Sequence, residues 1–292
     1  MFGRILTAMV TPFYADGGVN YEGAADLACY LAANGSDGIV VSGTTGEAPA
    51  LTAEEKAELF RVVRRAAPPA CKVVGSVGTN STSVSVKLAQ AAADAGLDGM
   101  MAVTPYYNKP SQEGMYRHFR AIAAAAPLPV MLYNIPSRSV VNLLPDTVAR
   151  LSAVPNIVSL KEATGSIDQM SELKLKLPED FAIYAGDDAL TLPLLALGSS
   201  GVVSVASHVV APQMQSMIAA FKAGDLAGAL DWHKKLYPIF KTLFITSNPA
   251  PIKFVLESLG HAVGPCRPPL AEPNGQESEQ LREITRLIRE MA

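Results

Sequence analysis

The chain has 292 residues, of which 49% are hydrophobic and 17% are charged, and its formal net charge is −3. This length and this apolar composition suit one large domain whose strands are buried on both faces, with a modest extension. The near-neutral charge, without a block of lysines and arginines, argues against nucleic acid as a partner.

The cysteines and the apolar segments predict the cellular compartment of the protein. Cys29, Cys71 and Cys266 are far apart and form no CxxC motif, which disfavours disulfides or a zinc site and fits reduced thiols in a cytoplasm. We expect no signal peptide, because no cleavage pattern follows the first apolar run. We also expect no membrane partner. The uncharged run at residues 189–221 is interrupted by Pro193 and by several glycines and serines, so it predicts a helix and a buried strand.

Short uncharged runs rich in branched residues predict eight strands along the earlier part of the chain. Helical signals lie between them, such as Thr52 and Glu55, which have the spacing of a capping box. Alternating strands and helices predict a parallel sheet, and eight repeats favour a closed (β/α)8 TIM barrel, an α/β fold, over an open doubly wound sheet. The runs begin near Ile5, Gly38, Lys72, Gly99, Pro129, Ile157, Phe181 and Gly201.

From about Asp225 the strand signals stop and only helical patterns follow. A proline-rich connector, which cannot be helical throughout, separates the last two of these stretches. We therefore expect a barrel catalytic domain at residues 1–224 and a C-terminal helical domain at residues 225–292, packed on the barrel or on a neighbouring subunit. The predicted helical stretches are residues 226–243, 252–259 and 280–291.

Catalytic groups of such barrels lie at the carboxyl ends of the strands. Two of these ends carry a lysine and a tyrosine that can act together in catalysis. Lys161 ends the sixth predicted strand and Tyr133 ends the fifth. A lysine in a partly desolvated barrel mouth can attack a ketone as a neutral amine and form a Schiff base. A phenol beside it can move protons, an effect worth about 10² to 10⁴ in rate. The alternative is an exposed Lys161 paired with Glu162.

Other strand ends add hydroxyls and a cation. Thr44 and Tyr107 offer hydroxyls for a proton relay, and the loop of residues 43–46 can direct backbone N–H groups at a small carboxylate. Arg138 can hold a second carboxylate in a bidentate manner. Each of these residues, taken alone, is equally compatible with an ordinary loop role. The four histidines are far apart and show no ligand spacing, so we expect no catalytic metal.

Taken together, the strand-end motifs resemble the dihydrodipicolinate synthase family. The likeness runs from Leu6 to about Leu270 and includes NPAPIK at 248–253. The motifs are GTTGE at 43–47, TPYYNKP at 104–110, YNIPSRS at 133–139, LKEATG at 160–165 and AGDD at 185–188.

The resemblance implies an activity and an assembly. It implies a lyase that condenses pyruvate with L-aspartate 4-semialdehyde through a lysine Schiff base. The product would be 4-hydroxy-tetrahydrodipicolinate, in the first committed step toward diaminopimelate and lysine. No cofactor is implied. Members of the family are usually tetramers built from two tight dimers, so the resemblance implies a homotetramer.

The resemblance also implies roles for single residues. Lys161 would form the Schiff base, Tyr133 would donate and accept protons, and Thr44 would complete a relay with Tyr107 of the neighbouring subunit. The pyruvate and semialdehyde contacts would come from Thr45, from the backbone near Gly186 and Val203, and from Arg138.

Two alternative functions remain open from the sequence. N-acetylneuraminate lyases and 2-keto-3-deoxy sugar-acid aldolases would share Lys161 and Tyr133, and Arg138 is the residue that distinguishes the synthase from them. A catalytically idle barrel that senses a keto acid is the second alternative, although it would have little need of the nucleophile and the relay together.

One departure from the family pattern concerns feedback by lysine. Lysine-inhibited members have a polar effector pocket with serine, histidines and a glutamate, in addition to asparagine and tyrosine. A lysine in place of a histidine and the loss of the glutamate would repel a cationic effector, so we predict weak or absent inhibition. The matching positions are Ala48, Ala53, Lys56 and Val84, with only Asn80 and Tyr106 kept.

Overall fold

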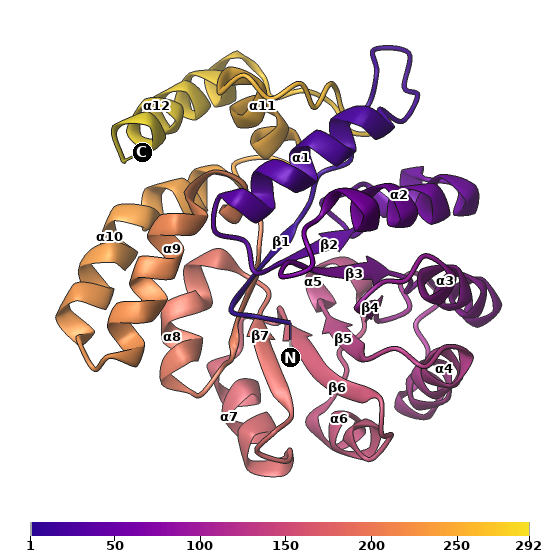
Figure 1. Ribbon diagram of the computed structural model, residues 1–292. Helices are drawn as coiled ribbons and strands as arrows, with labels where there is room; N and C mark the ends of the chain where they lie inside the picture. Colours follow the sequence, from indigo (N-terminus) through magenta and orange to yellow (C-terminus); the bar gives the residue numbers. More distant parts are fainter. Residues whose placement is uncertain (1, 292) are drawn as a thin grey trace.

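The computed structural model describes residues 2–291 and contains a closed barrel of eight parallel strands. Each strand pairs with its neighbours in sequence, and β8 returns to β1 to close the barrel. Figure 1 shows the helices arranged around these strands. The predicted (β/α)8 fold is therefore confirmed. The strands are β1 (Ile5–Ala8), β2 (Gly38–Val41), β3 (Lys72–Ser76), β4 (Gly99–Val103), β5 (Val130–Asn134), β6 (Ile157–Glu162), β7 (Ala182–Ala185) and β8 (Gly201–Ser204).

The helices follow the strands in the expected alternation. Short 3-10 turns, η1 (Ala48–Ala50) and η2 (Asp188–Leu190), follow β2 and β7. The helices are α1 (Tyr21–Ala33), α2 (Ala53–Ala66), α3 (Thr82–Asp94), α4 (Gln112–Ala125), α5 (Pro136–Ser139), α6 (Pro145–Ser152), α7 (Ile167–Lys176), α8 (Thr191–Ala196), α9 (Ser207–Lys222), α10 (Leu226–Thr242), α11 (Ala250–Ser258) and α12 (Gly275–Met291).

Burial of both strand faces explains the uncharged, branched runs of the sequence. One face of each strand packs against the helices, and the other fills the inside of the barrel. The inner cluster is separate from the outer one and includes Leu6, Val40, Val74, Met101, Met131, Tyr184 and Val203. The barrel is thus a packed core, and its polar side chains are concentrated where the strands end.

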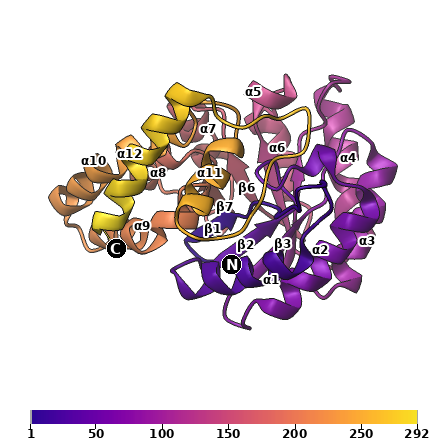
Figure 2. The same ribbon diagram turned by 90° about the horizontal axis from the view of Figure 1, so that it is seen from above.

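The chain after β8 forms a helical group on one side of the barrel. Helices α9 to α12 lie together on that side in both views (Figures 1 and 2). α10 packs against α9, and α12 packs against α10 and α11. α12 begins at Gly275, before the predicted Gln280, because Asn274 and Glu277 exchange two hydrogen bonds of 2.7 and 3.0 Å that cap a polar first turn.

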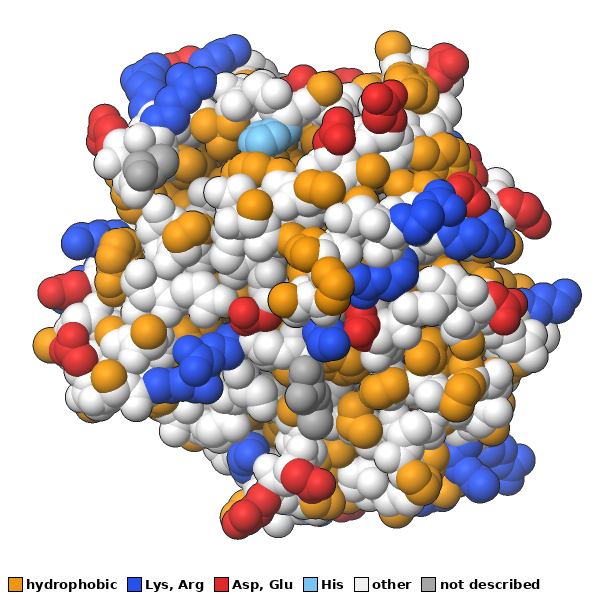
Figure 3. Space-filling view, viewed as in Figure 1, with side chains coloured by type: hydrophobic (Ala, Val, Ile, Leu, Met, Phe, Trp, Pro, Cys, Tyr) orange, Lys and Arg blue, Asp and Glu red, His pale blue; other side chains and the backbone are white. Residues whose placement is uncertain are grey.

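Charged side chains of both signs are interspersed on the face of the molecule seen in Figure 3. Among residues 2–291, no helix has the length and the hydropathy needed to span a bilayer. Across the same residues, no three His, Cys, Asp or Glu side chains come together in a group that could hold a metal ion.

Candidate active site

The sheet register places Lys161 beside Tyr133. Tyr133 of β5 pairs with Lys161 of β6, and the Lys161 Nζ lies 4.2 Å from the centroid of the tyrosine ring. The two residues are only 6% and 3% exposed. Their burial contradicts the alternative of a solvent-exposed lysine. The neighbouring carboxylate of Glu162 is used elsewhere, because it accepts a 2.7 Å hydrogen bond from the Thr164 N–H.

Glu162 belongs to a buried polar network that the sequence did not predict. Its second oxygen accepts longer hydrogen bonds, each of 3.4 Å, from the amides of Asn134 and Gln169. Desolvation raises the pKa of the Glu162 carboxyl, and these hydrogen bonds act in the opposite direction. Both amides also bond Asn142, so the network links the ends of β5 and β6 to α7. The strand ends that carry Tyr133 and Lys161 are thereby held together.

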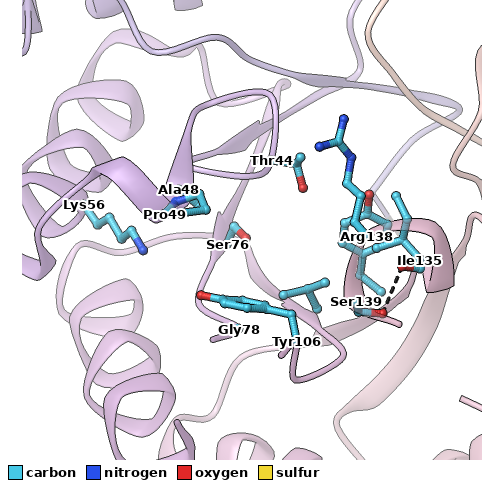
Figure 4. A pocket seen from close by; sticks show the side chains of 12 residues that line it. Thr44, Ala48, Pro49, Lys56, Ser76, Gly78, Tyr106, Ile135, Arg138 and Ser139 are labelled. Atoms are coloured by element: carbon cyan, nitrogen blue, oxygen red, sulfur yellow. Dashed lines mark hydrogen bonds between the residues drawn. The ribbon is translucent and has the colours of Figure 1, made fainter. Parts of the chain in front are cut away.

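A cavity of about 240 Å³ opens next to this pair. Its lining includes Thr44, Tyr133 and Arg138, and Lys161 adjoins it through the Tyr133 ring that it contacts. Figure 4 shows Arg138 and Thr44 facing the same space. The cavity therefore combines a hydroxyl, a phenol and a guanidinium beside a buried amine.

Arg138 lies on α5, the single turn that follows β5. The turn is held by the Ser139 hydroxyl, which donates to the Ile135 carbonyl at 2.9 Å, the bond drawn in Figure 4, and accepts from the Thr104 hydroxyl at 2.9 Å. Because Thr104 follows β4, two strand ends fix the position of the arginine. Its side chain is exposed, as a residue that receives a ligand from solvent would be.

The loop after β2 carries Thr45 and Glu47, and both side chains are buried against the C-terminal extension. Asn248 donates from Nδ2 to the Thr45 hydroxyl at 2.9 Å. Glu47, in the left-handed region at φ 57°, forms an ion pair of 2.8 Å with Lys253 of α11, and the two side chains are 1% and 3% exposed. Burial lowers the pKa of Lys253, whereas Glu47 raises it. The NPAPIK motif contributes to the family resemblance, but the sequence predicts no role for Asn248 or Lys253.

Gly186 and Val203 lie at the ends of β7 and β8. The Gly186 N–H donates to the Glu162 carbonyl at 2.8 Å, and a Cβ atom at this position would lie 2.5 Å from the Ala163 Cβ, so only glycine fits. Val203 is 1% exposed and faces the inside of the barrel. The turn after it is held by Asp188, which accepts the N–H groups of Val205 and Ala206 at 3.1 and 2.9 Å, while burial raises the Asp188 pKa.

Tyr107 is the one predicted relay residue that the single chain does not bring to the site. It is 88% exposed, in the left-handed region at φ 73°, and it does not line the cavity. Its neighbour Tyr106 does line the cavity. A role for Tyr107 therefore requires that it act in another copy of the chain.

Lys56 enters the same cavity from α2. It is 7% exposed, burial lowers its pKa, and it forms no ion pair within residues 2–291. Figure 4 shows the Lys56 side chain directed toward Tyr106. This part of the cavity thus contains a buried lysine side chain.

The fold and the site define the class of the protein as a (β/α)8-barrel lyase with a buried lysine and tyrosine on adjacent strand ends. The model of the dihydrodipicolinate synthetase family matches residues 1–288, and the chain belongs to this family. It is 52% identical over 280 residues to the 4-hydroxy-tetrahydrodipicolinate synthase of Moorella thermoacetica, with 96% of each chain covered. It is 55% identical over 284 residues to that of Thermosynechococcus vestitus, covering 97% of this chain and 96% of the relative.

A solved structure is equally similar. The dihydrodipicolinate synthase of Cyanidioschyzon merolae, determined with lysine bound, superposes with a TM-score of 0.97 at 48% identity. The match covers 99% of this chain and 98% of the other. The fold and the family assignment therefore agree.

Proposed function

We propose that this protein condenses pyruvate with L-aspartate 4-semialdehyde to give 4-hydroxy-tetrahydrodipicolinate, the first committed step toward diaminopimelate and lysine. The observation that carries the proposal is the buried Lys161 amine against the Tyr133 ring, beside a cavity that holds Thr44 and Arg138. The curated relatives are named 4-hydroxy-tetrahydrodipicolinate synthase, and their similarity to this chain extends over nearly their whole length. They support the choice of substrates.

The reaction proceeds in steps that involve Lys161 and Tyr133. The Lys161 amine adds to the ketone of pyruvate, and Tyr133 donates the proton with which the hydroxyl leaves as water, giving an iminium ion. Loss of a methyl proton gives an enamine, whose carbon adds to the aldehyde of the second substrate. The amino group of that substrate then attacks the imine carbon, and Lys161 leaves as the free amine.

The remaining residues bind the substrate carboxylates and transfer protons. Thr45 and the backbone near Gly186 and Val203 bind the pyruvate carboxylate, and Arg138 receives the carboxylate of the semialdehyde. Thr44 links Tyr133 to Tyr107 of a neighbouring subunit, which conducts protons to and from water. We propose a cytoplasmic homotetramer of two tight dimers, in which a second copy supplies Tyr107.

The domain division is a further part of the proposal. We propose that residues 1–224 form the catalytic barrel and that residues 225–292 form the helical domain. α9 ends at Lys222 and α10 begins at Leu226, which is where this boundary falls.

The proposed function is tested by offering three aldehydes separately. Pyruvate consumption is followed with L-aspartate 4-semialdehyde, with N-acetylmannosamine and with glyceraldehyde. We expect consumption with the semialdehyde alone, and loss of that consumption in the Lys161→Ala variant. Consumption only with a sugar aldehyde would instead assign the protein to the sugar-acid lyases and remove the role proposed for Arg138.

The cavity also leads to a proposal about feedback. The lysine-bound state was observed in the relative from Cyanidioschyzon merolae, whereas here the buried Lys56 ammonium would repel a cationic effector and Val84 supplies no counter-charge. We expect L-lysine to inhibit turnover weakly or not at all in steady-state assays. Clear inhibition at submillimolar lysine would contradict this expectation.

A further inference from the structure

We propose that Asn248, a residue of the C-terminal extension, is a positioning residue that directs the Thr45 hydroxyl toward the carboxylate of pyruvate. Its amide Nδ2 donates to the Thr45 Oγ1 at 2.9 Å across a sequence separation of 203 residues. The two residues are 5% and 3% exposed, so no bulk water competes for this contact. The extension is thereby part of the pyruvate site.

The direction of this hydrogen bond decides what Thr45 can do. A hydroxyl has one proton to donate and two lone pairs that accept. Because the Asn248 amide occupies a lone pair of Thr45, the hydroxyl proton remains available for an acceptor other than Asn248. An ionised carboxylate is the stronger kind of acceptor, and a hydrogen bond to it is roughly twice as strong as one between neutral groups.

The segment that follows Asn248 is anchored to the same loop that carries Thr45. Lys253, on the first turns of α11, forms the buried 2.8 Å ion pair with Glu47 and also donates to the Pro265 carbonyl at 2.8 Å. The other Glu47 oxygen accepts the Arg267 N–H at 2.8 Å. The extension therefore contacts the loop at Thr45 and at Glu47.

The proposal rests on the proposed function for the identity of the ligand, so the test uses pyruvate alone. The pyruvate concentration that gives half-maximal borohydride-trapped adduct is measured by mass spectrometry for each variant. This readout needs no aldehyde, so it stands even if the condensation partner has been misassigned. A wild-type chain that traps no adduct would overturn the proposed Schiff base and this inference with it.

Two substitutions of Asn248 separate positioning from simple packing. Asn248→Ala removes the donor and should raise half-saturating pyruvate by roughly 3- to 10-fold. Asn248→Asp keeps the shape but turns the donor into an acceptor, so the Thr45 proton would go to the new carboxylate. We therefore expect a larger rise for Asn248→Asp than for Asn248→Ala.

A double variant and a control complete the test. If Asn248 acts through Thr45, then Asn248→Ala should have little further effect once Thr45→Val has removed the hydroxyl. Asn156 lies just before β6, and its amide donates to the Ala123 carbonyl at 2.8 Å. It is the control, because Asn156→Ala should lower Tm without changing pyruvate affinity. The proposal is overturned if both Asn248 variants stay within about twofold of wild type, if Asn248→Asp is the milder variant, or if the Thr45 and Asn248 effects add.

Discussion

Lys161 lies between two tyrosines whose environments differ. Its register partners are Tyr133 on β5 and Tyr184 on β7, both buried in the barrel. The Tyr184 hydroxyl is committed to the Gly3 carbonyl at 3.0 Å, and burial raises its pKa to about 12. Tyr133 instead lines the cavity beside Arg138. Only one of the two phenols is therefore placed to exchange protons with a substrate.

The two tyrosines give a matched pair of variants. Tyr133→Phe should lower kcat by about 10² to 10⁴, because the proton donor for water loss is removed while the packing is kept. Tyr184→Phe should leave kcat close to wild type and cost about 1 kcal/mol of stability for its lost hydrogen bond. Steady-state kinetics and urea unfolding measure both effects. Equal losses of kcat in the two variants would contradict the assignment.

The sequence predicts which residues lie together where their chemistry coincides with a strand end. Lys161, Tyr133, Thr44 and Arg138 are gathered in one region because parallel strands of a barrel end on the same face. Asn248 has no such local signal, because its partner Thr45 is distant in the chain and the contact depends on how the extension folds back. No periodicity encodes a contact of that kind.

At the scale of elements, the loop after β2 and helix α11 are joined by a buried charge pair. Lys253 lies 4.4 Å from the centre of the Phe13 ring, and the Arg267 guanidinium lies at the same distance. Arg267 also forms a bidentate contact with Glu55 of α2 through bonds of 2.8 and 2.6 Å. The extension is thus attached to the barrel through charged groups as well as through apolar packing.

The buried pair should show strong coupling in unfolding experiments. Lys253→Met should cost about 3 to 5 kcal/mol, because it leaves the Glu47 carboxylate buried without its partner. Adding Glu47→Gln should restore much of that loss by removing the uncompensated charge. Glu58→Gln, which breaks the exposed Arg61 pair, is the control and should cost less than about 1 kcal/mol. Additive losses at residues 47 and 253 would show that the pair is not coupled.

The predicted boundaries of helices and strands agree with the structure where local side-chain bonds or uniform burial specify them. Thr52 and Glu55 form the predicted capping box at the start of α2, with bonds of 2.8 and 3.2 Å. The strand starts were predicted to within about one residue, because runs buried on both faces are uniformly apolar. The start of α12 was placed too late, since its first turn is polar and the apolar period begins only at Leu281.

At the scale of the whole molecule, a histidine helps to close the barrel. His208 Nε2 accepts the Val10 N–H at 3.1 Å, and Nδ1 donates to the Val205 carbonyl at 2.8 Å. One neutral imidazole thereby joins the chain after β1 to the chain after β8. Burial is the main cause that lowers its pKa to about 4.

Acid should therefore destabilise the fold through this residue. Because the folded-state pKa is depressed, the contribution of His208 is fully present above about pH 6.5 and is lost as the pH falls toward 4. Urea unfolding should show about 2 kcal/mol of this loss between about pH 7.5 and pH 5. His208→Asn keeps a donor to Val205 but does not titrate, so its stability should fall less over that interval. An identical pH dependence in the two proteins would rule out His208 as the source.

Quaternary structure should govern turnover. Tyr107 is exposed in the single chain, and we proposed that it joins the relay of a neighbouring copy. Dilution to the monomer, verified by ultracentrifugation, should therefore lower kcat toward the value of a Tyr107→Phe variant, with Schiff-base formation retained in part. A monomer with full turnover would refute this assembly requirement.

The contact between Asn248 and Thr45 also has a consequence for synthesis on the ribosome. The loop that carries Thr45 leaves the ribosome about 10 to 40 s before Asn248 does, at typical elongation rates over a sequence separation of 203 residues. During that interval the nascent barrel holds a carboxylate at Glu47 without its lysine. If Asn248 positions Thr45 as proposed, translation that stops after β8 would yield all eight strands but an unfinished pyruvate site, and synthesis of the segment from Asn248 onward would complete that site.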